Sequence, residues 1–260
     1  MRAIRLAFAA FAYLCFFAAF LYLVGFVGNL LVPKSIDSGP TTPLALTLPI
    51  DLALIALFGL QHSVMARPGF KRWITRYVHP ASERSVYVLA TVAVLVAMFA
   101  LWRPIPILLW TARADWLVML LWALFALGWS VVFVTTWLLD HFELFGLQQA
   151  WLHFRGREAA SPRFREPLFY RWVRHPLYLG FLLAFWAIPT MTVGHALFAA
   201  GMTAYILIAI RYEERDLTAL LGDSYADYRT RVGMLVPGIG RARRRAAPQA
   251  LTPVSRPPAT

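Results

Sequence analysis

Long apolar runs separated by short polar segments dominate this chain. Four of them, at residues 6–32, 44–66, 85–102 and 116–139, are each near the roughly 20 residues with which a helix crosses a lipid bilayer. A fifth apolar region, at residues 177–210, is too long for one ordinary span and is interrupted between Pro189 and Gly194. Because Pro and Gly punctuate helices, we interpret it as a hairpin of two short helices. The pattern predicts an all-α, polytopic membrane helix bundle with about six spans.

Composition strengthens this interpretation. Hydrophobic residues make up 60% of the 260 positions and charged residues 15%, whereas soluble domains rarely exceed about 50% apolar residues. Aromatic residues are abundant, as is typical of helix bundles and of the belts at membrane interfaces. The single cysteine, Cys15, excludes an intrachain disulfide. We therefore expect a lipid bilayer around the chain and see no sign of an obligate protein partner.

The distribution of basic residues predicts how the chain is oriented. A formal net charge of +12 raises nucleic acid as a partner, but the Lys and Arg lie between and after the apolar runs. Of these 25 residues, only Lys34, Arg103 and Arg113 fall in the loops on one side of the predicted spans. By the positive-inside rule both termini are expected in the cytoplasm. No nucleic-acid partner is expected.

The C-terminal segment differs from the rest of the chain. Residues 238–260 are basic and then rich in Pro and Ala, without an apolar period. We expect one transmembrane domain at residues 1–237, divided into N-terminal spans at 1–139 and a core at 140–237, followed by a disordered tail. The arginines at 241–245 either anchor the chain by the positive-inside rule or contact anionic lipid headgroups.

Ionisable residues gather where the fourth predicted span ends. Asp140, His141 and Glu143 emerge directly from apolar sequence, where ionisable groups are costly unless they are paired or used. Chemistry and simple helix termination explain this motif equally well.

A second polar motif, RHPLYLG, opens the hairpin. Pro176 suits the first position of a helix, which places His175 at the helix mouth. Tyr178 faces another side of that helix, and Gly180 permits the close approach of a neighbouring helix or a ligand. The alternative is an interfacial anchor.

A third motif, RYEERD, follows the hairpin. Glu213 and Glu214 lie near the expected helix C-terminus, where the macrodipole disfavours anions, so we expect arginines or a bound cation as partners. Farther on, Tyr225 and Tyr228 are three residues apart and can share a helical face. They either pack a cofactor ring or anchor the helix at the interface.

In this order and spacing the motifs resemble the isoprenylcysteine carboxyl methyltransferase superfamily of membrane proteins. The match comprises RHPLYLG, a hairpin, RYEERDL, and GDSYADYRTRV before a proline, at residues 170–237. In the N-terminal half, FGLQHSVMARPGFKRW, ERSVYVL and DHFELFGLQQ resemble the bacterial branch of NnrU-like proteins and methanethiol S-methyltransferases. The resemblance implies a bacterial inner-membrane enzyme with a cofactor pocket on the cytoplasmic side. It would transfer a methyl group from S-adenosyl-L-methionine to a small thiol, converting methanethiol to dimethyl sulfide.

The resemblance also implies roles for individual residues. The expected cofactor-binding residues are Arg174, His175, Pro176, Tyr178, Gly180, Tyr212, Glu213, Glu214 and Tyr225. Arg211 matches an arginine that lies near the reacting group in carboxyl methyltransferases, where it helps to place a carboxylate. Because methanethiol has no carboxylate, we expect Arg211 to orient the methionine carboxylate or to steady the glutamates.

A thiol acceptor needs a group that takes its proton, because small thiols are mostly protonated near neutral pH. Our first candidate is His141, with Asp140 to orient it unless Asp140 bonds elsewhere; His62 and Glu143 are weaker candidates. The expected substrate-binding residues are Gln61, His62 and Gln148. The histidines show no close ligand spacing for zinc, so no metal is expected.

Three alternatives remain open. The acceptor can be another group, such as a prenylcysteine carboxylate, a lipid amine or a phenolic oxygen. The chain can also be a non-catalytic NnrU-like membrane protein, or a haem protein that uses His62 and His141 as axial ligands.

Overall fold

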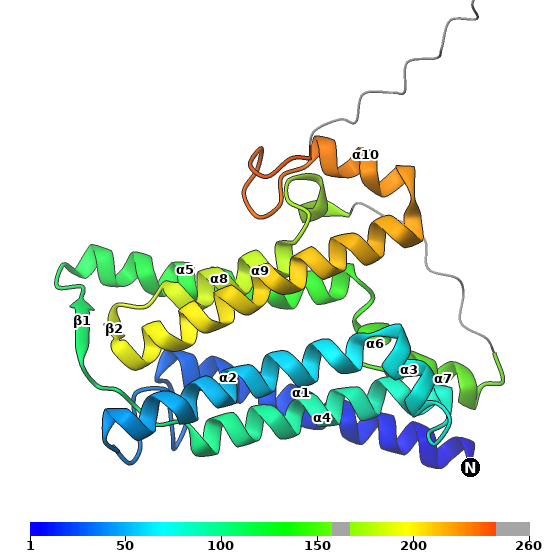
Figure 1. Ribbon diagram of the computed structural model, residues 1–260, viewed down its shortest axis with the longest axis horizontal. Coiled ribbons are helices and arrows are strands. Elements are labelled where there is room, and N and C mark those ends of the chain that lie inside the picture. Colours follow the sequence, from blue (N-terminus) through cyan, green and yellow to red (C-terminus); the bar gives the residue numbers. More distant parts are fainter. Residues whose placement is uncertain (158–166, 243–260) are drawn as a thin grey trace, which may run out of the picture.

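The computed structural model describes residues 1–157 and 167–242. Within these ranges, five helices are long and apolar enough to cross a membrane: α1 (Arg2–Gly28), α2 (Leu44–Ala66), α4 (Pro80–Leu101), α5 (Asp115–Leu138) and α9 (Val193–Leu221). The shorter apolar helix α8 (Pro176–Trp186) packs between α5 and α9 (Figure 1). The predicted all-α, polytopic membrane bundle is confirmed.

Short elements lie at the two ends of the bundle. One end carries α3 (Pro68–Ile74), α6 (His141–Leu144), α7 (Leu147–Phe154), the 3-10 helix η1 (Leu168–Arg171) and α10 (Asp223–Arg231) (Figure 1). At the other end β1 (Leu108–Thr111) pairs antiparallel with β2 (Thr190–Thr192), with Trp110 opposite Met191. The apolar pattern did not predict these two strands, because they are too short to produce an alternating signal.

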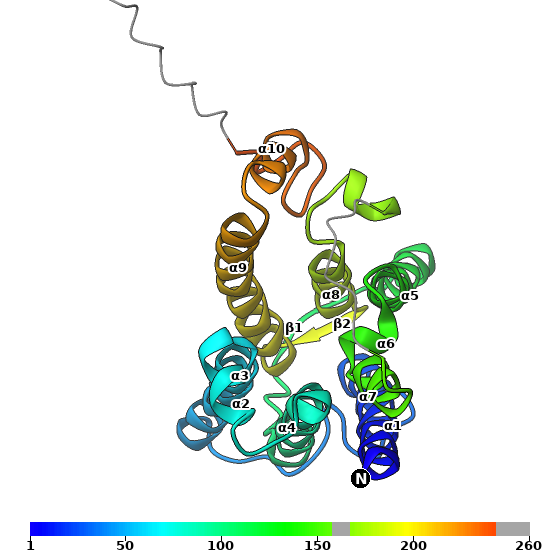
Figure 2. The same cartoon turned by 90° about the vertical axis from the view of Figure 1, so that its right-hand side faces the viewer.

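The long helices form two layers around a common core. Viewed end-on, α9, α8 and α5 lie over α2, α4 and α1 (Figure 2). Large aromatic side chains such as Phe26, Phe185 and Phe198 are buried between the layers and contact one another edge to face. Each layer therefore supplies one wall of the interior.

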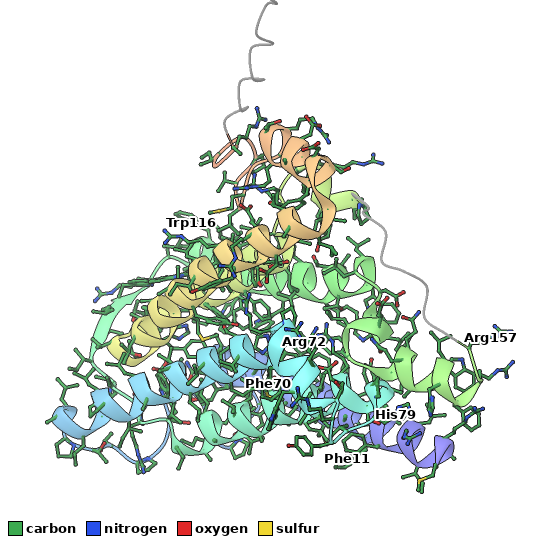
Figure 3. The ribbon with its side chains drawn as sticks, turned by 45° about the vertical axis from the view of Figure 1, so that its right-hand side comes forward. Phe11, Phe70, Arg72, His79, Trp116 and Arg157 are labelled. Atoms are coloured by element: carbon green, nitrogen blue, oxygen red, sulfur yellow. The ribbon has the colours of Figure 1, made fainter. Side chains whose placement is uncertain are left out.

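The outer surface of the bundle is apolar. Phe11 and Trp116 point away from the helices, with 58% and 67% of their surface exposed (Figure 3). Exposed apolar surface is unfavourable in water by about 25 cal/mol per Å², and a lipid environment removes that cost. The surface thus has the character expected of a chain that lies in a membrane.

The predicted hairpin has one short and one long helix. Helix α8 has 11 residues, whereas α9 has 29 and continues through Arg211 to Leu221 instead of ending near Ile210. At 1.5 Å per residue α9 is about 44 Å long, which exceeds the roughly 30 Å hydrocarbon core of a bilayer. Its last turns therefore reach past the apolar layer, because the charged residues in them favour water.

The ordered chain extends beyond Pro237. The carbonyl of Gly240 accepts a hydrogen bond from Arg174, and the amide of Ala242 donates to the carbonyl of Arg229. The predicted disordered tail, apart from its first five residues, and most of the arginines at 241–245 lie outside the described residues.

Two glycines allow α5 and α8 to touch. A Cβ atom on Gly128 would lie 2.6 Å from the amide nitrogen of Ala184 and 2.7 Å from the carbonyl oxygen of Gly180. A Cβ atom on Gly180 would in turn lie 2.7 Å from the carbonyl oxygen of Gly128. Gly180 thus allows the close approach of a neighbouring helix that the sequence predicted as one of its two roles.

We expect Gly128→Ala to lower the stability of the bundle, because the added methyl group meets backbone atoms that cannot move aside. Overpacking of this kind typically costs about 1–3 kcal/mol. Thermal unfolding in detergent, followed by circular dichroism, measures the change. Gly69→Ala is the matched control, since a Cβ atom there meets no atom within 4 Å. Equal unfolding midpoints for the two variants would contradict the role given to Gly128.

Candidate functional site

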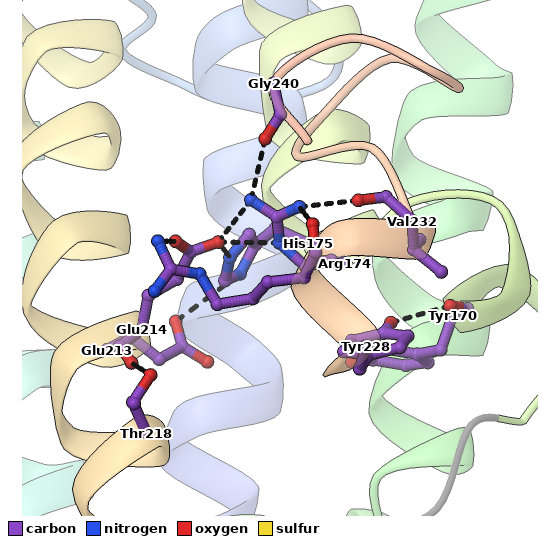
Figure 4. Close-up of polar contacts among 10 residues, drawn as sticks. Tyr170, Arg174, His175, Glu213, Glu214, Thr218, Tyr228, Val232 and Gly240 are labelled. Atoms are coloured by element: carbon purple, nitrogen blue, oxygen red, sulfur yellow. Dashed lines mark hydrogen bonds and ion pairs between the residues drawn. The ribbon is translucent and has the colours of Figure 1, made fainter. Parts of the chain in front are cut away.

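A buried arginine lies where α8, α9 and the C-terminal segment meet (Figure 4). The Arg174 side chain is 2% exposed, and its Nε and Nη2 atoms both lie 2.7 Å from Oε1 of Glu214. Its Nη groups donate to the carbonyl oxygens of Arg229, Val232 and Gly240. Because the protein itself engages all three nitrogens of the guanidinium, Arg174 acts as a clamp between α9 and the segment after α10.

Backbone contacts reinforce this clamp. The amide of Arg174 donates to the carbonyl of Gly233 over 2.9 Å, and the amide of His175 donates to that of Met234 over 3.2 Å. The residues just before α8 thus pair with the segment just after α10. This pairing joins the start of the RHPLYLG motif to the residues just after the GDSYADYRTRV motif, about 60 residues later in the chain.

Glu214 is fully committed to partners inside the protein. Its side chain is 9% exposed and contacts Arg174, Nη2 of Arg229 at 3.0 Å and Nε2 of His175 at 3.2 Å. The sequence left open whether arginines or a cation would balance the glutamates. For Glu214 the structure supplies two arginines.

Glu213 differs from its neighbour. Its side chain is 44% exposed, and its Oε2 atom lies 3.8 Å from Nδ1 of the buried His175. The ring of Tyr178 lies beside that imidazole, with centroids 5.7 Å apart. Among the described residues no arginine pairs with Glu213. The structure therefore distinguishes two glutamates that the sequence could not, and leaves the carboxylate of Glu213 accessible to a ligand.

The tyrosines of α10 pack inside the protein. Tyr225 and Tyr228 share one helical face, with ring centroids 5.7 Å apart, and form a small apolar cluster with Val232. The hydroxyl of Tyr228 donates to the carbonyl of Tyr170. Burial raises the pKa of Tyr225 and of Tyr170, so both hydroxyls keep their protons near neutral pH. These rings hold α10 against the chain that precedes α8.

An apolar cavity of about 270 Å³ lies beside the charged residues Arg174, His175, Glu213 and Glu214, here called the charged cluster. Phe, Leu, Val and Met side chains from both helix layers supply most of its wall. The polar members of the wall are His62, Arg84, Tyr87, Thr91, Thr136, Tyr178 and Tyr205. Tyr178 borders the cavity and also contacts His175, so it connects the apolar cavity with the charged cluster.

The predicted residues of α2 divide into one that reaches the cavity and one that does not. His62 lines the cavity, accepts or donates a 2.8 Å hydrogen bond with the hydroxyl of Tyr87, and stacks on Phe58. Gln61 does not line it. The side-chain amide of Gln61 instead lies 3.1 Å from Sδ of Met65.

His141 lies behind the cavity wall. One ring nitrogen bonds to the hydroxyl of Tyr13 and the other to that of Thr136, both over 2.8 Å. The ring stacks on Trp137 at a centroid distance of 4.5 Å. Burial lowers the pKa of His141, which keeps the imidazole neutral near pH 7. Both nitrogens already have partners, and the ring is not part of the cavity wall.

The carboxylate that was expected to orient His141 points elsewhere. An oxygen of Asp140 accepts a hydrogen bond of 3.4 Å from Gln148, and Asp140 itself has a left-handed backbone with φ 68°. Glu143 is exposed, and its backbone carbonyl accepts from Gln149. None of Asp140, Glu143 and Gln148 lines the cavity.

The remaining predicted residues are Pro176, Arg211 and Tyr212. Pro176 is buried at the first position of α8, as expected. Arg211 is exposed and makes no hydrogen bond or ion pair within the described part of the chain. The exposed ring of Tyr212 lies under the guanidinium of Arg67, at 4.8 Å from its centroid. Arg67 itself pairs with Asp216 at 2.7 Å, which ties α2 to α9.

Sequence reasoning missed five polar residues of the cavity wall: Arg84, Tyr87, Thr91, Thr136 and Tyr205. The first two belong to ERSVYVL, where an arginine precedes a tyrosine by three positions at the start of an apolar run. That spacing places both side chains on one face of a helix. The available signal was thus a cation and a hydroxyl on the same face of a membrane span.

We expect Arg174→Gln to loosen the C-terminal segment, because the change removes the clamp and leaves Glu214 short of a positive charge. Breaking a buried ion pair typically costs about 3–5 kcal/mol. Thermal unfolding and limited proteolysis between residues 222 and 242 measure the effect. In the control Arg231→Gln, the exposed pair with Asp227 is lost, and such pairs contribute at most about 1 kcal/mol. Equal resistance of both variants to unfolding and proteolysis would argue against the clamp.

Comparisons with known proteins fit this geometry. A family model described as NnrU protein matches residues 52–236. A methanethiol S-methyltransferase of Mycobacterium tuberculosis is 49% identical, over 91% of this chain and 97% of that protein. Methanethiol S-methyltransferase 2 of Bradyrhizobium diazoefficiens is 50% identical over 97% of both chains. Human nurim is 33% identical over 65% of this chain and 68% of its own. No solved structure matches. With the matched residues covering most of its length, this chain belongs to the NnrU family.

Proposed function

We propose that this protein is a membrane methyltransferase that methylates a small thiol and converts methanethiol to dimethyl sulfide. The observation that carries the proposal is the apolar cavity whose wall, at Tyr178, adjoins the cluster of His175 and Glu213. Relatives with about half of their residues identical, over nearly the whole chain, are methanethiol S-methyltransferases. A charged site beside an apolar one suits a reaction between a charged donor and an apolar acceptor.

The methyl donor in this proposal is S-adenosyl-L-methionine. Bound there, it supplies a methyl group carried on a positively charged sulfur. The residues of the cluster fit such a group, because the accessible carboxylate of Glu213 can accept hydrogen bonds from ribose hydroxyls or an ammonium group. The rings of His175 and Tyr178 offer a flat wall for a nucleoside. Arg174 and Glu214 position this wall without contacting the donor, since their polar atoms are already engaged.

The side chains of the cavity wall position the acceptor and keep water away from it. A small thiol surrounded by Phe and Leu side chains is separated from water and held near the cluster. Alignment and desolvation of this kind contribute several kcal/mol to a displacement reaction. Arg211, which the family resemblance links to a carboxylate acceptor, is exposed and absent from the wall. This supports a thiol over a prenylcysteine carboxylate.

The proposed location is the bacterial inner membrane, with both termini and the cluster on the cytoplasmic side. The N-terminus and α10 lie at the same end of the bundle as α3, α6 and α7 (Figure 1). Lys34 lies at the opposite end, where its Nζ donates to the carbonyls of Ala100 and Trp102. This separation follows the positive-inside rule and gives the cluster access to a cytoplasmic methyl donor.

We expect the purified protein in detergent to transfer a labelled methyl group from S-adenosyl-L-methionine to methanethiol. Longer thiols should react more slowly as their chains exceed the cavity, and a prenylcysteine should not react. Headspace detection of dimethyl sulfide and scintillation counting measure the products. Transfer only to the prenylcysteine carboxylate, or donor binding without methylation of any thiol, would refute the proposal.

We expect Glu213→Gln to raise the KM for S-adenosyl-L-methionine about tenfold or more, because a hydrogen bond to a charged group contributes about 1.5–3 kcal/mol. Its unfolding midpoint should stay near that of the wild type, since the side chain is half exposed. Glu214→Gln should instead lower the midpoint, because it disrupts the buried clamp. Steady-state kinetics and thermal unfolding of both variants test this. The reverse assignment of the two effects would show that Glu214 is the donor contact.

A further inference from the structure

Three polar side chains interrupt the apolar wall of the cavity at one place. His62 comes from α2, and Arg84 and Tyr87 come from α4, one turn apart. The guanidinium of Arg84 lies 5.4 Å from the centroid of the Tyr87 ring, and the Tyr87 hydroxyl lies 2.8 Å from Nε2 of His62. These three residues, here called the α2–α4 triad, have no part in the cluster around Arg174.

The hydrogen-bond order in the triad follows from Thr91. Its hydroxyl donates to the backbone carbonyl of Tyr87 over 3.0 Å, so its oxygen is left to accept a proton from Nδ1 of His62, at 3.4 Å. The network therefore assigns the hydrogen of the imidazole to Nδ1. Nε2 is left as the acceptor for the hydroxyl hydrogen of Tyr87. The Tyr87 oxygen then has free lone pairs on the cavity side and can accept a proton.

Arg84 is only partly used by the protein. Its Nε donates to the carbonyl of Leu144 over 2.9 Å, whereas its Nη groups make no hydrogen bond or ion pair within residues 1–157 and 167–242. Arg84 also borders a second, polar hollow of about 250 Å³ that includes Lys71, Glu83 and Glu143. A guanidinium with free donors thus separates the apolar cavity from a hollow lined by charged residues.

We propose that the α2–α4 triad activates the acceptor thiol, with Arg84 holding the thiolate and Tyr87 and His62 taking the proton. The S–H bond breaks as its proton passes to the Tyr87 oxygen, while the Tyr87 hydroxyl proton passes to Nε2 of His62. The electron pair remains on sulfur, beside the Nη groups of Arg84. After the methyl transfer, His62 returns its proton through Tyr87 to solvent water. This inference rests on the proposed function and assigns its acceptor site.

The place of the triad in the cavity wall, and the charge of Arg84 within it, favour this assignment over His141. An opposite charge a few ångströms away favours the ionised form of a group, and the low polarity of the surrounding wall strengthens the effect. His141 has no place in the cavity wall, and no arginine among the described residues contacts it. The other titratable side chains that face the triad are Tyr178 of α8 and Tyr205 of α9, with Lys71, Glu83 and Glu143 in the hollow beyond Arg84.

The test compares two thiols that differ in acidity. Methanethiol depends on the enzyme for ionisation, whereas 2,2,2-trifluoroethanethiol ionises more readily because its fluorines withdraw electrons. We expect Arg84→Gln to lower kcat/KM for methanethiol at pH 7 by about tenfold to a hundredfold. For trifluoroethanethiol the loss should be less than about threefold. The rate with methanethiol should rise again at higher pH, and Arg84→Lys should restore part of it.

Tyr87→Phe keeps the ring and removes the proton acceptor, so it should show the same selective loss, as should His62→Gln. Arg72→Gln, at an exposed arginine of α3 outside both hollows, is the matched control and should behave as the wild type. Binding of S-adenosyl-L-methionine, measured by isothermal titration calorimetry, should be unchanged in all five variants.

The outcomes separate this inference from the proposed function. Equal losses for both thiols would reduce the triad to a structural role. Weaker donor binding in Arg84→Gln, with no difference between the thiols, would show that Arg84 holds the carboxylate of the donor instead. A wild-type protein that methylates neither thiol would refute the proposed function itself.

Discussion

The ion pair between Arg174 and Glu214 is the interaction on which the functional end of this molecule depends. Two buried charges are tolerated because each finds partners in every direction: a second arginine and a histidine for the carboxylate, and backbone carbonyls for the guanidinium. The pair links the start of α8, the last turns of α9 and the segment after α10. The backbone pairing of Arg174 with Gly233 and the buried rings of Tyr225 and Tyr228 reinforce this link.

The ion pair between Arg174 and Glu214 explains why the two neighbouring glutamates have different surroundings. The polar atoms of Glu214 and Arg174 already have partners within the protein, so the neighbouring Glu213 is the carboxylate left for a ligand. The apolar cavity connects this charged region, through Tyr178, with the α2–α4 triad in the same wall. A charged donor and an apolar acceptor each require a different solvent, and the fold supplies both within one helix bundle.

His141 illustrates why a polar residue at the end of a membrane span is ambiguous in sequence. Its hydrogen-bond partner Tyr13 is 128 residues away in the chain, and its other partner, Thr136, lies one turn back near the end of α5. These partners occupy both ring nitrogens, and aromatic side chains surround the ring. His62, with an equally plain sequence context, reaches the cavity because Thr91 and Tyr87 of α4 fix its orientation.

The sequence by itself determined the bundle and the positions of its long spans. Span length and hydropathy are local properties of the sequence, and the thickness of a bilayer sets the length that a spanning helix needs. The order of the motifs carried the family resemblance. Only the tertiary structure decided that α9 continues to Leu221, that Gly180 meets Gly128, which glutamate is exposed, and that Arg84 and Tyr87 face the cavity. Those features depend on the rotation and register of one helix against another. Long-range packing sets both quantities, and no local pattern encodes them.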